Sequence, residues 1–368
     1  MKITFPHMGN TYIALKAMFE ELGAEVVLPP KSNKRTLELG TKYAPESICI
    51  PFKLTLGNYM ESIEKGADTL FMWSGCDVCR IGYYQALHRN ILKKLGYEFE
   101  LICVEPFKSF QEIKEVLDKL KIVSNKKGYY HLIPIFVKGI QLIHRIDKLD
   151  ELICRIRPRA VDSRVVEGLN NDFQQEILQA RGCDEAVGII KKYEEAFEGV
   201  QADSEGTIIK IGIIGEIYTV LDPFINQDLV KNLGHMGVEV HCSVTASEFI
   251  REQIDFLPFV YSNKEAIHQW ARPYLDREIG GHARHSIGNA VRFGEEAFDG
   301  VIHLMPFTCM PEIVAQSILP TIEREKNIPV LKLILDEMTG IGGYQTRVEA
   351  FVDLLRRRKL GKNLCKHI

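Results

Sequence analysis

Long apolar runs are missing from this sequence of 368 residues, because no stretch approaches the ~20 residues that a membrane span needs. The first residues, MKITFPHMG, lead straight into a strand-like pattern and lack the charged, apolar and cleavage regions of a signal peptide. We therefore expect a cytoplasmic protein with no membrane partner.

An excess of charge of one sign is also missing. The chain has 46 Lys and Arg residues against 49 Asp and Glu residues, a formal net charge of −3. This balance gives no sign of a nucleic-acid surface or an acidic tail. The nine cysteines are an odd number and do not form the pattern of a secreted disulfide framework. They suit a reducing compartment, where metal binding is an open option.

The chain contains an internal repeat. Residues 2–6 predict a strand, residues 12–22 a helix that ends at Gly23, and AEVVLP a second strand. Much later, TIIKIGIIG predicts a strand, Asp222 and Pro223 fit the N-cap and first position of a helix, and GVEVHCS predicts the next strand. Both parts therefore open with a βαβ pattern.

The repeat continues around a third strand in each part. Gly57 and Asn58 precede the predicted strand 69–73 at the same spacing at which Gly288 and Asn289 precede the predicted strand 301–305. The segments SGCDVC and PFTCMP follow these strands. Helical patterns at 81–95 and 311–326 come next, and then the apolar segments EFELICV and IPVLKLIL.

These patterns predict an α/β fold with two domains of similar topology, residues 1–125 and 206–368. Each domain should hold a mainly parallel sheet of about four strands with helices on both faces. Residues 126–205 show helical periodicity with polar interruptions and predict a helical connector. Roughly two domains also fit the chain length at ~150 residues each.

Four cysteines lie where α/β proteins bind ligands. Cys76 and Cys309 follow the third strand of their domains, and Cys49 and Cys79 lie close to predicted helix starts. The carboxyl ends of parallel strands form the ligand-binding edge of a sheet, so Cys76 and Cys309 should both face a shared cleft. Helix N-termini lower thiolate pKa values and stabilise anions. Four thiolates could hold an iron–sulfur cluster at this place.

The cysteine spacing alone leaves other interpretations open. Cys76 and Cys79 could form a redox pair or half of a zinc site, and a zinc-stabilised or metal-free binding module remains an alternative. Cys103, Cys154 and Cys242 fit buried core positions better than ligand positions.

Several segments resemble the 2-hydroxyacyl-CoA dehydratase family, especially the domain that accompanies its ATP-dependent activators and is described as activase-related. They are PESICIPFKLTLGNYMESIEKGAD, SGCDVCR, HLMPFTCMPE and IPVLKLILDEMTGIGGYQTRVEAFVDLL. The resemblance implies two flavodoxin-like (Rossmann-like) domains with an oxygen-sensitive [4Fe-4S] cluster between them, or a double-cubane [8Fe-9S] cluster as in some relatives. It matches Cys49, Cys76 and Cys309 to the family's cysteine sites and makes Cys79 the candidate fourth ligand.

The resemblance also implies a homodimer, an anaerobic setting, a separate ATP-dependent activator, and a small-molecule or acyl-CoA ligand. By the same resemblance, an activator carries an actin-like ATPase domain with a glycine-rich nucleotide loop. The sequence shows neither that domain nor a GxxxxGK[ST] motif, so we do not expect the chain to hydrolyse ATP itself. Two mechanisms follow. Four ligands would close the cluster for low-potential electron transfer, whereas three would leave one iron open for the reduction or dehydration of a bound molecule. Lys53, Arg80, His282, Arg284 and His285 are candidates to offset negative charge nearby.

Overall fold

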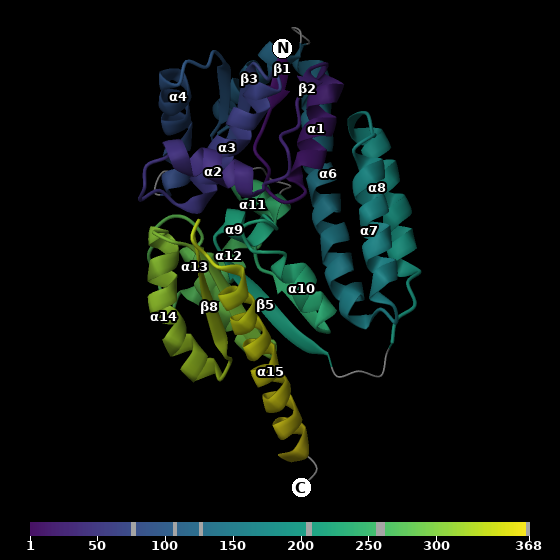
Figure 1. The fold of residues 1–368 in the computed structure, drawn as a ribbon, viewed down its shortest axis with the longest axis vertical. Helices are drawn as coiled ribbons and strands as arrows, with labels where there is room; N and C mark the ends of the chain where they lie inside the picture. Colours follow the sequence, from purple (N-terminus) through teal and green to yellow (C-terminus); the bar gives the residue numbers. More distant parts are fainter. Residues whose placement is uncertain (75–78, 106–108, 125–127, 204–207, 255–261, 366–368) are drawn as a thin grey trace. The chain divides into compact units, whose positions relative to one another are not determined.

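Two four-stranded sheets, each with all its strands parallel, form the framework of the chain (Figure 1). The computed structural model describes residues 1–74, 79–105, 109–124, 128–203, 208–254 and 262–365. The first sheet has the order β2-β1-β3-β4 and the second the order β6-β5-β7-β8. The predicted α/β fold with two parallel sheets of similar topology is therefore confirmed. The strands are β1 (Lys2–Thr4), β2 (Glu25–Val26), β3 (Thr69–Trp73), β4 (Glu100–Val104), β5 (Ile209–Gly215), β6 (Val238–Cys242), β7 (Gly300–Pro306) and β8 (Val330–Leu335).

Helices connect the strands of both sheets. Those from the first half of the chain are α1 (Thr11–Leu22), α2 (Lys34–Tyr43), α3 (Ile50–Glu64), the 3₁₀ helix η1 (Arg80–Tyr83), α4 (Tyr84–Lys94) and α5 (Phe110–Val123). Those from the second half are α9 (Ile217–Leu221), α10 (Leu229–His235), α11 (Ala246–Gln253), α12 (Lys264–Ala271), α13 (Ala283–Glu295), α14 (Met310–Lys326) and α15 (Ile341–Cys365). No helix in the described part of the chain is long and apolar enough to cross a membrane.

The middle of the chain is helical. It contains α6 (Tyr129–Ile156), the 3₁₀ helix η2 (Arg157–Arg159), α7 (Ser163–Ile177) and α8 (Gly182–Glu198). Helices α7 and α8 run side by side (Figure 1), joined by an ion pair of 2.6 Å between Lys192 Nζ and Glu176 Oε2 and by an edge-to-face contact of Phe173 with Tyr193.

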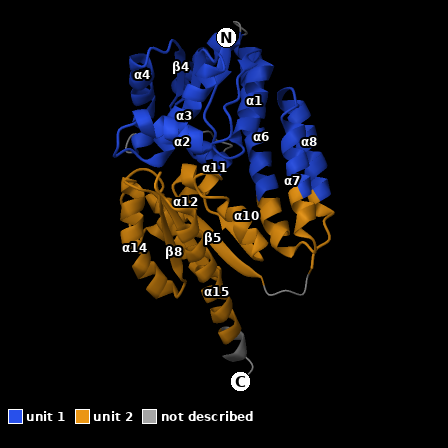
Figure 2. Cartoon of the chain, in the orientation of Figure 1, with its two compact units in different colours: residues 1–150, 168–196, 245–262 blue, residues 151–167, 197–244, 263–368 orange. Residues whose placement is uncertain are grey.

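The chain forms two compact units, each built from several segments (Figure 2). Unit 1 comprises residues 1–150, 168–196 and 245–262, and unit 2 comprises residues 151–167, 197–244 and 263–368. The first sheet belongs to unit 1 and the second to unit 2. The division into residues 1–125, 126–205 and 206–368 stays a prediction about the sequence repeat.

The repeat extends to polar contacts at the amino ends of the strands. In each unit, a lysine on the central strand donates its backbone N–H to an aspartate that precedes the third strand, at 2.8 Å, and its ammonium faces a glutamate on the second strand. These residues are Lys2, Asp68 and Glu25 in unit 1, and Lys210, Asp299 and Glu239 in unit 2. Because this edge lies opposite the ligand-binding edge, we assign these contacts to register and stability.

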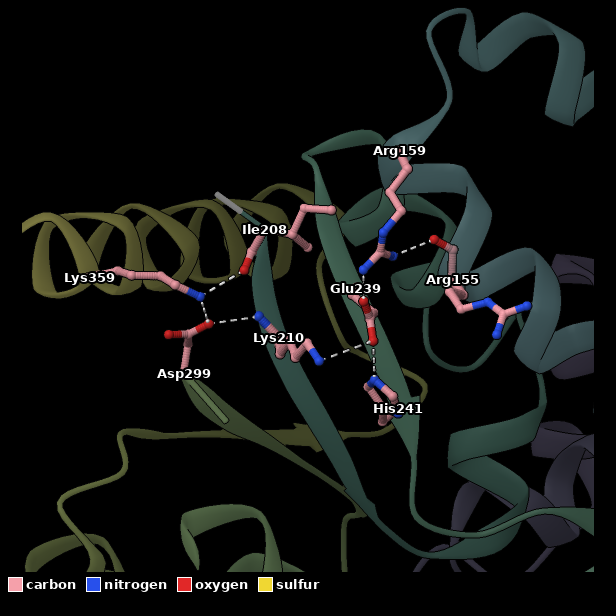
Figure 3. Close-up of polar contacts among 8 residues, drawn as sticks. All are labelled: Arg155, Arg159, Ile208, Lys210, Glu239, His241, Asp299 and Lys359. Atoms are coloured by element: carbon pink, nitrogen blue, oxygen red, sulfur yellow. Dashed lines mark hydrogen bonds and ion pairs between the residues drawn. The ribbon is translucent and has the colours of Figure 1, made fainter. Parts of the chain in front are cut away.

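Unit 2 enlarges this network (Figure 3). Glu239 also binds Arg159, and its Oε1 lies 2.6 Å from His241 Nε2. The Lys359 ammonium of α15 donates to Asp299 Oδ2 at 2.6 Å and to the Ile208 carbonyl at 2.7 Å. The last helix is thereby fastened to the start of β5.

Two glycines set the distance between neighbouring helices in the two units. A Cβ on Gly57 of α3 would lie 2.0 Å from the Thr36 carbonyl oxygen of α2, and one on Gly288 of α13 would lie 2.2 Å from the Ile267 carbonyl oxygen of α12. Both distances are far below van der Waals contact. The predicted correspondence of Gly57 with Gly288 thus has a physical basis, which is the close approach of two helix backbones.

The predicted helix start at Pro223 is wrong. The Asp222 carboxylate accepts N–H groups of Phe224 and Ile225, as a cap would, but a turn follows and α10 begins only at Leu229. Gln227 and Asp228 adopt positive φ angles, which end any helical path before α10.

Candidate functional site

The topology gives each sheet one switch point. In unit 1, β2 and β3 lie on opposite sides of β1, and in unit 2, β6 and β7 lie on opposite sides of β5. Connections that leave in opposite directions open a crevice at the carboxyl ends of the central strands, where open α/β sheets bind their ligands. The candidate site residues are therefore expected in the segments that follow β3, β5 and β7 and at the starts of α3 and α13, the helices that lead into β3 and β7.

Cys49 occupies the N-cap position of α3, with Pro51 in the first turn. Because α3 runs back to the amino end of β3, its N-terminus lies at the carboxyl edge of the first sheet. The thiol is buried, its Sγ lies 2.8 Å from the Tyr84 hydroxyl, and it makes no hydrogen bond that caps the helix. A thiolate here would accept the Tyr84 hydroxyl proton in a charge-assisted hydrogen bond.

Cys79 occupies the N-cap position of η1, a few residues after β3. The next residue, Arg80, donates from Nη1 to the Ser47 carbonyl at 2.8 Å. This bond ties the segment of Cys79 to the segment that enters Cys49, and the Cys49 contact with Tyr84 of α4 does the same. Unit 1 therefore brings the starts of α3 and η1 together. Cys76 lies outside the described residues.

Cys309 occupies the N-cap position of α14 in unit 2, as its sequence predicted, with Pro311 and Glu312 in the first turn. Its N–H donates to the Pro306 carbonyl at 3.1 Å, and its carbonyl accepts the Ile313 N–H at 2.9 Å. Thr308 before it has a φ of 68°, a strained angle for a β-branched residue, which turns the chain sharply out of β7.

Cys79 and Cys309 hold equivalent places in the repeat. Both are N-caps of the helix that follows the third strand of their sheet. The difference in residue number between Asp68 and Asp299 is the same as that between Gly57 and Gly288. Applied to Cys79, this difference gives Met310, the residue next to Cys309.

Thiols are the donors that iron–sulfur clusters use, so the chemistry of this set fits such a group. Among the described residues, which do not include Cys76, no group of three or more His, Cys, Asp or Glu side chains could hold a metal ion. Cys49 and Cys79 belong to unit 1 and Cys309 to unit 2.

Two other cysteines differ from these in their surroundings. Burial, with the charge of Glu105, raises the pKa of Cys103 to about 11, and burial with the Glu21 carboxylate raises the pKa of Cys183 to about 12. Thiols with such pKa values stay protonated near neutral pH and are poor ligands. Cys103 is a buried residue of β4, in agreement with the core position that its sequence predicted.

The predicted cationic neighbours have specific partners. Lys53 is only 2% exposed and donates from Nζ to the Glu46 carbonyl at 3.2 Å. Arg284 pairs with Glu278 at 2.5 Å. His282 is the N-cap of α13 and thus holds in unit 2 the place that Cys49 holds in unit 1, and the His285 ring packs edge-to-face on His268.

Unit 2 contains a buried acidic cluster that the sequence reasoning did not identify. His303 of β7 lies with its Nε2 2.7 Å from Glu312 Oε2, the Ser286 hydroxyl donates to the same oxygen at 2.9 Å, and all three side chains are fully buried. Glu312 Oε1 and His303 Nδ1 have no hydrogen-bond partner among the described residues. The sequence does contain a signal for this cluster: a charged or polar residue stands beside apolar strand residues, Glu216 in GIIGEIY and His303 in VIHLM.

Glu216 belongs to the same cluster electrostatically. It is the N-cap of α9 directly after β5, and its two carboxylate oxygens accept the N–H groups of Tyr218 and Thr219 at 3.0 and 2.9 Å. Burial raises the pKa of Glu216 to about 7; the two N–H groups oppose this shift, and the nearby Glu312 carboxylate adds to it.

We predict that Glu216 makes the protein less stable as the pH rises. Between its unfolded pKa of about 4.5 and its folded pKa of about 7, the folded protein retains the proton and the unfolded chain releases it. The free energy of unfolding therefore falls with rising pH, by about 3 kcal/mol over this range. A Glu216→Gln variant should lose this dependence, as measured by urea unfolding from pH 4 to pH 8.

The control is Glu265→Gln, which neutralises an exposed carboxylate on α12 of the same unit. It should keep the wild-type slope of stability against pH. The assignment is wrong if Glu216→Gln and Glu265→Gln have the same slope.

Comparison with known proteins adds one finding to this two-unit α/β fold. Residues 6–80 match the family model described as CoA enzyme activase uncharacterised domain (DUF2229). The matched segment contains Cys49, Cys76 and Cys79, and Cys309 lies outside it. No curated protein matches the chain. The N-terminal part is thus similar to a domain of CoA enzyme activases.

Proposed function

We propose that this protein binds a [4Fe-4S] cluster through Cys49, Cys76, Cys79 and Cys309 and acts in low-potential electron transfer or in the reduction of a small molecule. The observation that carries the proposal is the shared position of three of these cysteines. Cys49, Cys79 and Cys309 are each the N-cap of a helix at the carboxyl edge of a parallel sheet, and none uses its thiol to cap that helix.

The local electrostatics support this ligand set. The first N–H groups of α3 and α14 carry partial positive charge toward Cys49 and Cys309, which favours thiolates and an anionic cluster. The Tyr84 hydroxyl adds a donor at Cys49, and the Arg80 guanidinium brings a full positive charge to the Ser47 carbonyl, two residues before Cys49. The cluster, when bound, would supply one-electron chemistry.

The matched activase domain supports the choice of partner. A domain of this kind, on a chain without a GxxxxGK[ST] motif, favours a separate ATP-dependent activator that delivers the electron. The activator relationship, the homodimer and the anaerobic setting all belong to this proposal.

The repeat favours a closed cluster. Because Cys79 has in unit 1 the place that Cys309 has in unit 2, it is the natural fourth ligand. A cluster with four cysteine ligands has no open iron and suits electron transfer. One alternative is a 2-hydroxyacyl-CoA dehydratase-like enzyme, in which Cys79 is not a ligand and one iron is therefore open to a bound molecule. The other is a double-cubane [8Fe-9S] reductase.

A Cys79→Ser variant separates closed from open ligation. With four cysteine ligands, the variant should lose most of its iron and sulfide after anaerobic purification, whereas Cys242→Ser, at the end of β6, should keep both. Iron content, sulfide content and the EPR spectrum of the reduced protein are the measurements. If Cys79→Ser retains the wild-type cluster and responds to added small ligands as the wild type does, Cys79 is not a ligand. That result would favour the dehydratase-like alternative with an open iron.

A further inference from the structure

Unit 1 contains a polar cavity that none of the described candidate cysteines lines. Its volume is about 510 Å³, which is within the usual range for small-molecule sites. Residues of three helices supply the described walls, and Ile140 is the only apolar residue among the described lining residues. The lining residues are Ile140, Gln141, His144, Arg145 and Lys148 of α6, Glu194 of α8, and Ser247 and Arg251 of α11.

Helical spacing explains how these side chains converge. The α6 residues recur at intervals of three and four, so they share one face of that helix. Ser247 and Arg251 are one turn apart on α11. Their helix is held to α6 by the Asp147 carboxylate, which accepts the Ser247 N–H at 2.7 Å, and by Arg251, whose Nη2 donates to His144 Nδ1 at 2.9 Å.

The cavity carries an excess of positive charge. Arg145, Lys148 and Arg251 line it, whereas Glu194 is the only acidic residue among the described lining residues. The bond from Arg251 requires a lone pair on His144 Nδ1, so the imidazole is neutral in this arrangement.

The nearby carboxylates compensate these cations only weakly. Glu194 lies 3.9 Å from Arg145 Nη1, and Glu248 lies 3.6 Å from Arg251 Nη1, so both are loose ion pairs. Pairs of this kind on partly exposed side chains contribute little stability. Asp147 directs its carboxylate to the backbone of α11. A ligand with two or more negative charges would therefore be a stronger partner for the guanidinium groups.

We propose that this cavity binds a small molecule that carries a phosphate or diphosphate group. Arg145, Lys148 and Arg251 neutralise the phosphate oxygens, and the arginines offer paired N–H donors that match their geometry. Gln141 and Ser247 hydrogen-bond the polar body of the ligand. The excess of positive charge in the cavity disfavours a divalent cation.

Inorganic pyrophosphate is the probe for this site. Titration calorimetry of the full chain at low ionic strength should show one saturable site for pyrophosphate. Arg145→Gln should weaken its binding about tenfold, and Glu194→Gln should strengthen it, because the competing carboxylate is removed. A loss of folding would weaken binding in both variants, so it does not explain opposite changes in affinity. Circular dichroism of each variant checks the fold.

Lys34→Gln is the matched control, because Lys34 is a highly exposed lysine of α2 in the same unit. It should bind pyrophosphate as the wild type does. Equal weakening by Lys34→Gln and Arg145→Gln would show non-specific charge attraction and overturn the proposal. Absence of saturable binding to the wild type, or unchanged affinity in both Arg145→Gln and Glu194→Gln, would overturn it as well. Because the cavity shares no described residue with the proposed cluster ligands, these outcomes are independent of iron content.

Discussion

Cys49→Ser and Cys309→Ser variants should each lose most of their iron and acid-labile sulfide. Each cysteine stands at a helix start where the backbone N–H groups favour a thiolate, and a serine hydroxyl does not ionise there to replace it. Because Cys49 belongs to unit 1 and Cys309 to unit 2, loss of the cluster in both variants would also show that both units contribute ligands. Iron and sulfide assays after anaerobic purification give the result.

Cys103→Ser and Cys183→Ser are the controls for this prediction. Burial raises the pKa of Cys103 to about 11 and that of Cys183 to about 12, so neither thiol should serve as a ligand. Both variants should retain the iron content of the wild type. Equal iron content in all four variants would contradict the assigned ligand set.

Gly57→Ala should destabilise the protein by about 3 kcal/mol or more. The new methyl group would lie 2.0 Å from the Thr36 carbonyl oxygen, and this neighbour is backbone and cannot rotate away. Helices α2 and α3 would have to separate, which places the change at the upper end of overpacking effects. Gly288→Ala should have a similar effect, because its methyl group would lie 2.2 Å from the Ile267 carbonyl oxygen. The midpoint of urea unfolding measures both.

Gly188→Ala on α8 is the matched control, because a Cβ there meets nothing within 4 Å. It should stabilise the protein by up to about 1 kcal/mol, the usual gain when alanine replaces glycine in a helix. If Gly57→Ala and Gly188→Ala shift the midpoint equally, the close helix approach in unit 1 is wrong.

Strands β3 and β7 were predictable because nearly all their residues are buried on both faces, which gives continuous apolar runs. The apolar segment predicted at 69–73 is β3, and the segment predicted at 301–305 lies within β7. Gly23 marks the end of α1 with a φ of 92°, an angle that glycine adopts without strain. Signals of this kind are local in sequence, and the repeat strengthens them because each appears twice.

Features that depend on contacts between distant segments were not predictable. Glu216 follows β5 and Glu312 lies in the first turn of α14, so only the folded sheet brings their charges close enough to interact. Helix α9 spans only Ile217–Leu221, too short a segment to show a period. The polar cavity likewise draws its residues from three helices that are far apart in the sequence.

The central claim is the iron–sulfur cluster, and metal analysis of the anaerobically purified wild-type protein tests it most directly. The proposal predicts about four irons and about four sulfides per chain, with an EPR signal of a reduced iron–sulfur cluster after addition of a strong reductant. About eight irons and nine sulfides would instead indicate the double-cubane alternative. A protein that contains only zinc, or no metal, would contradict the account.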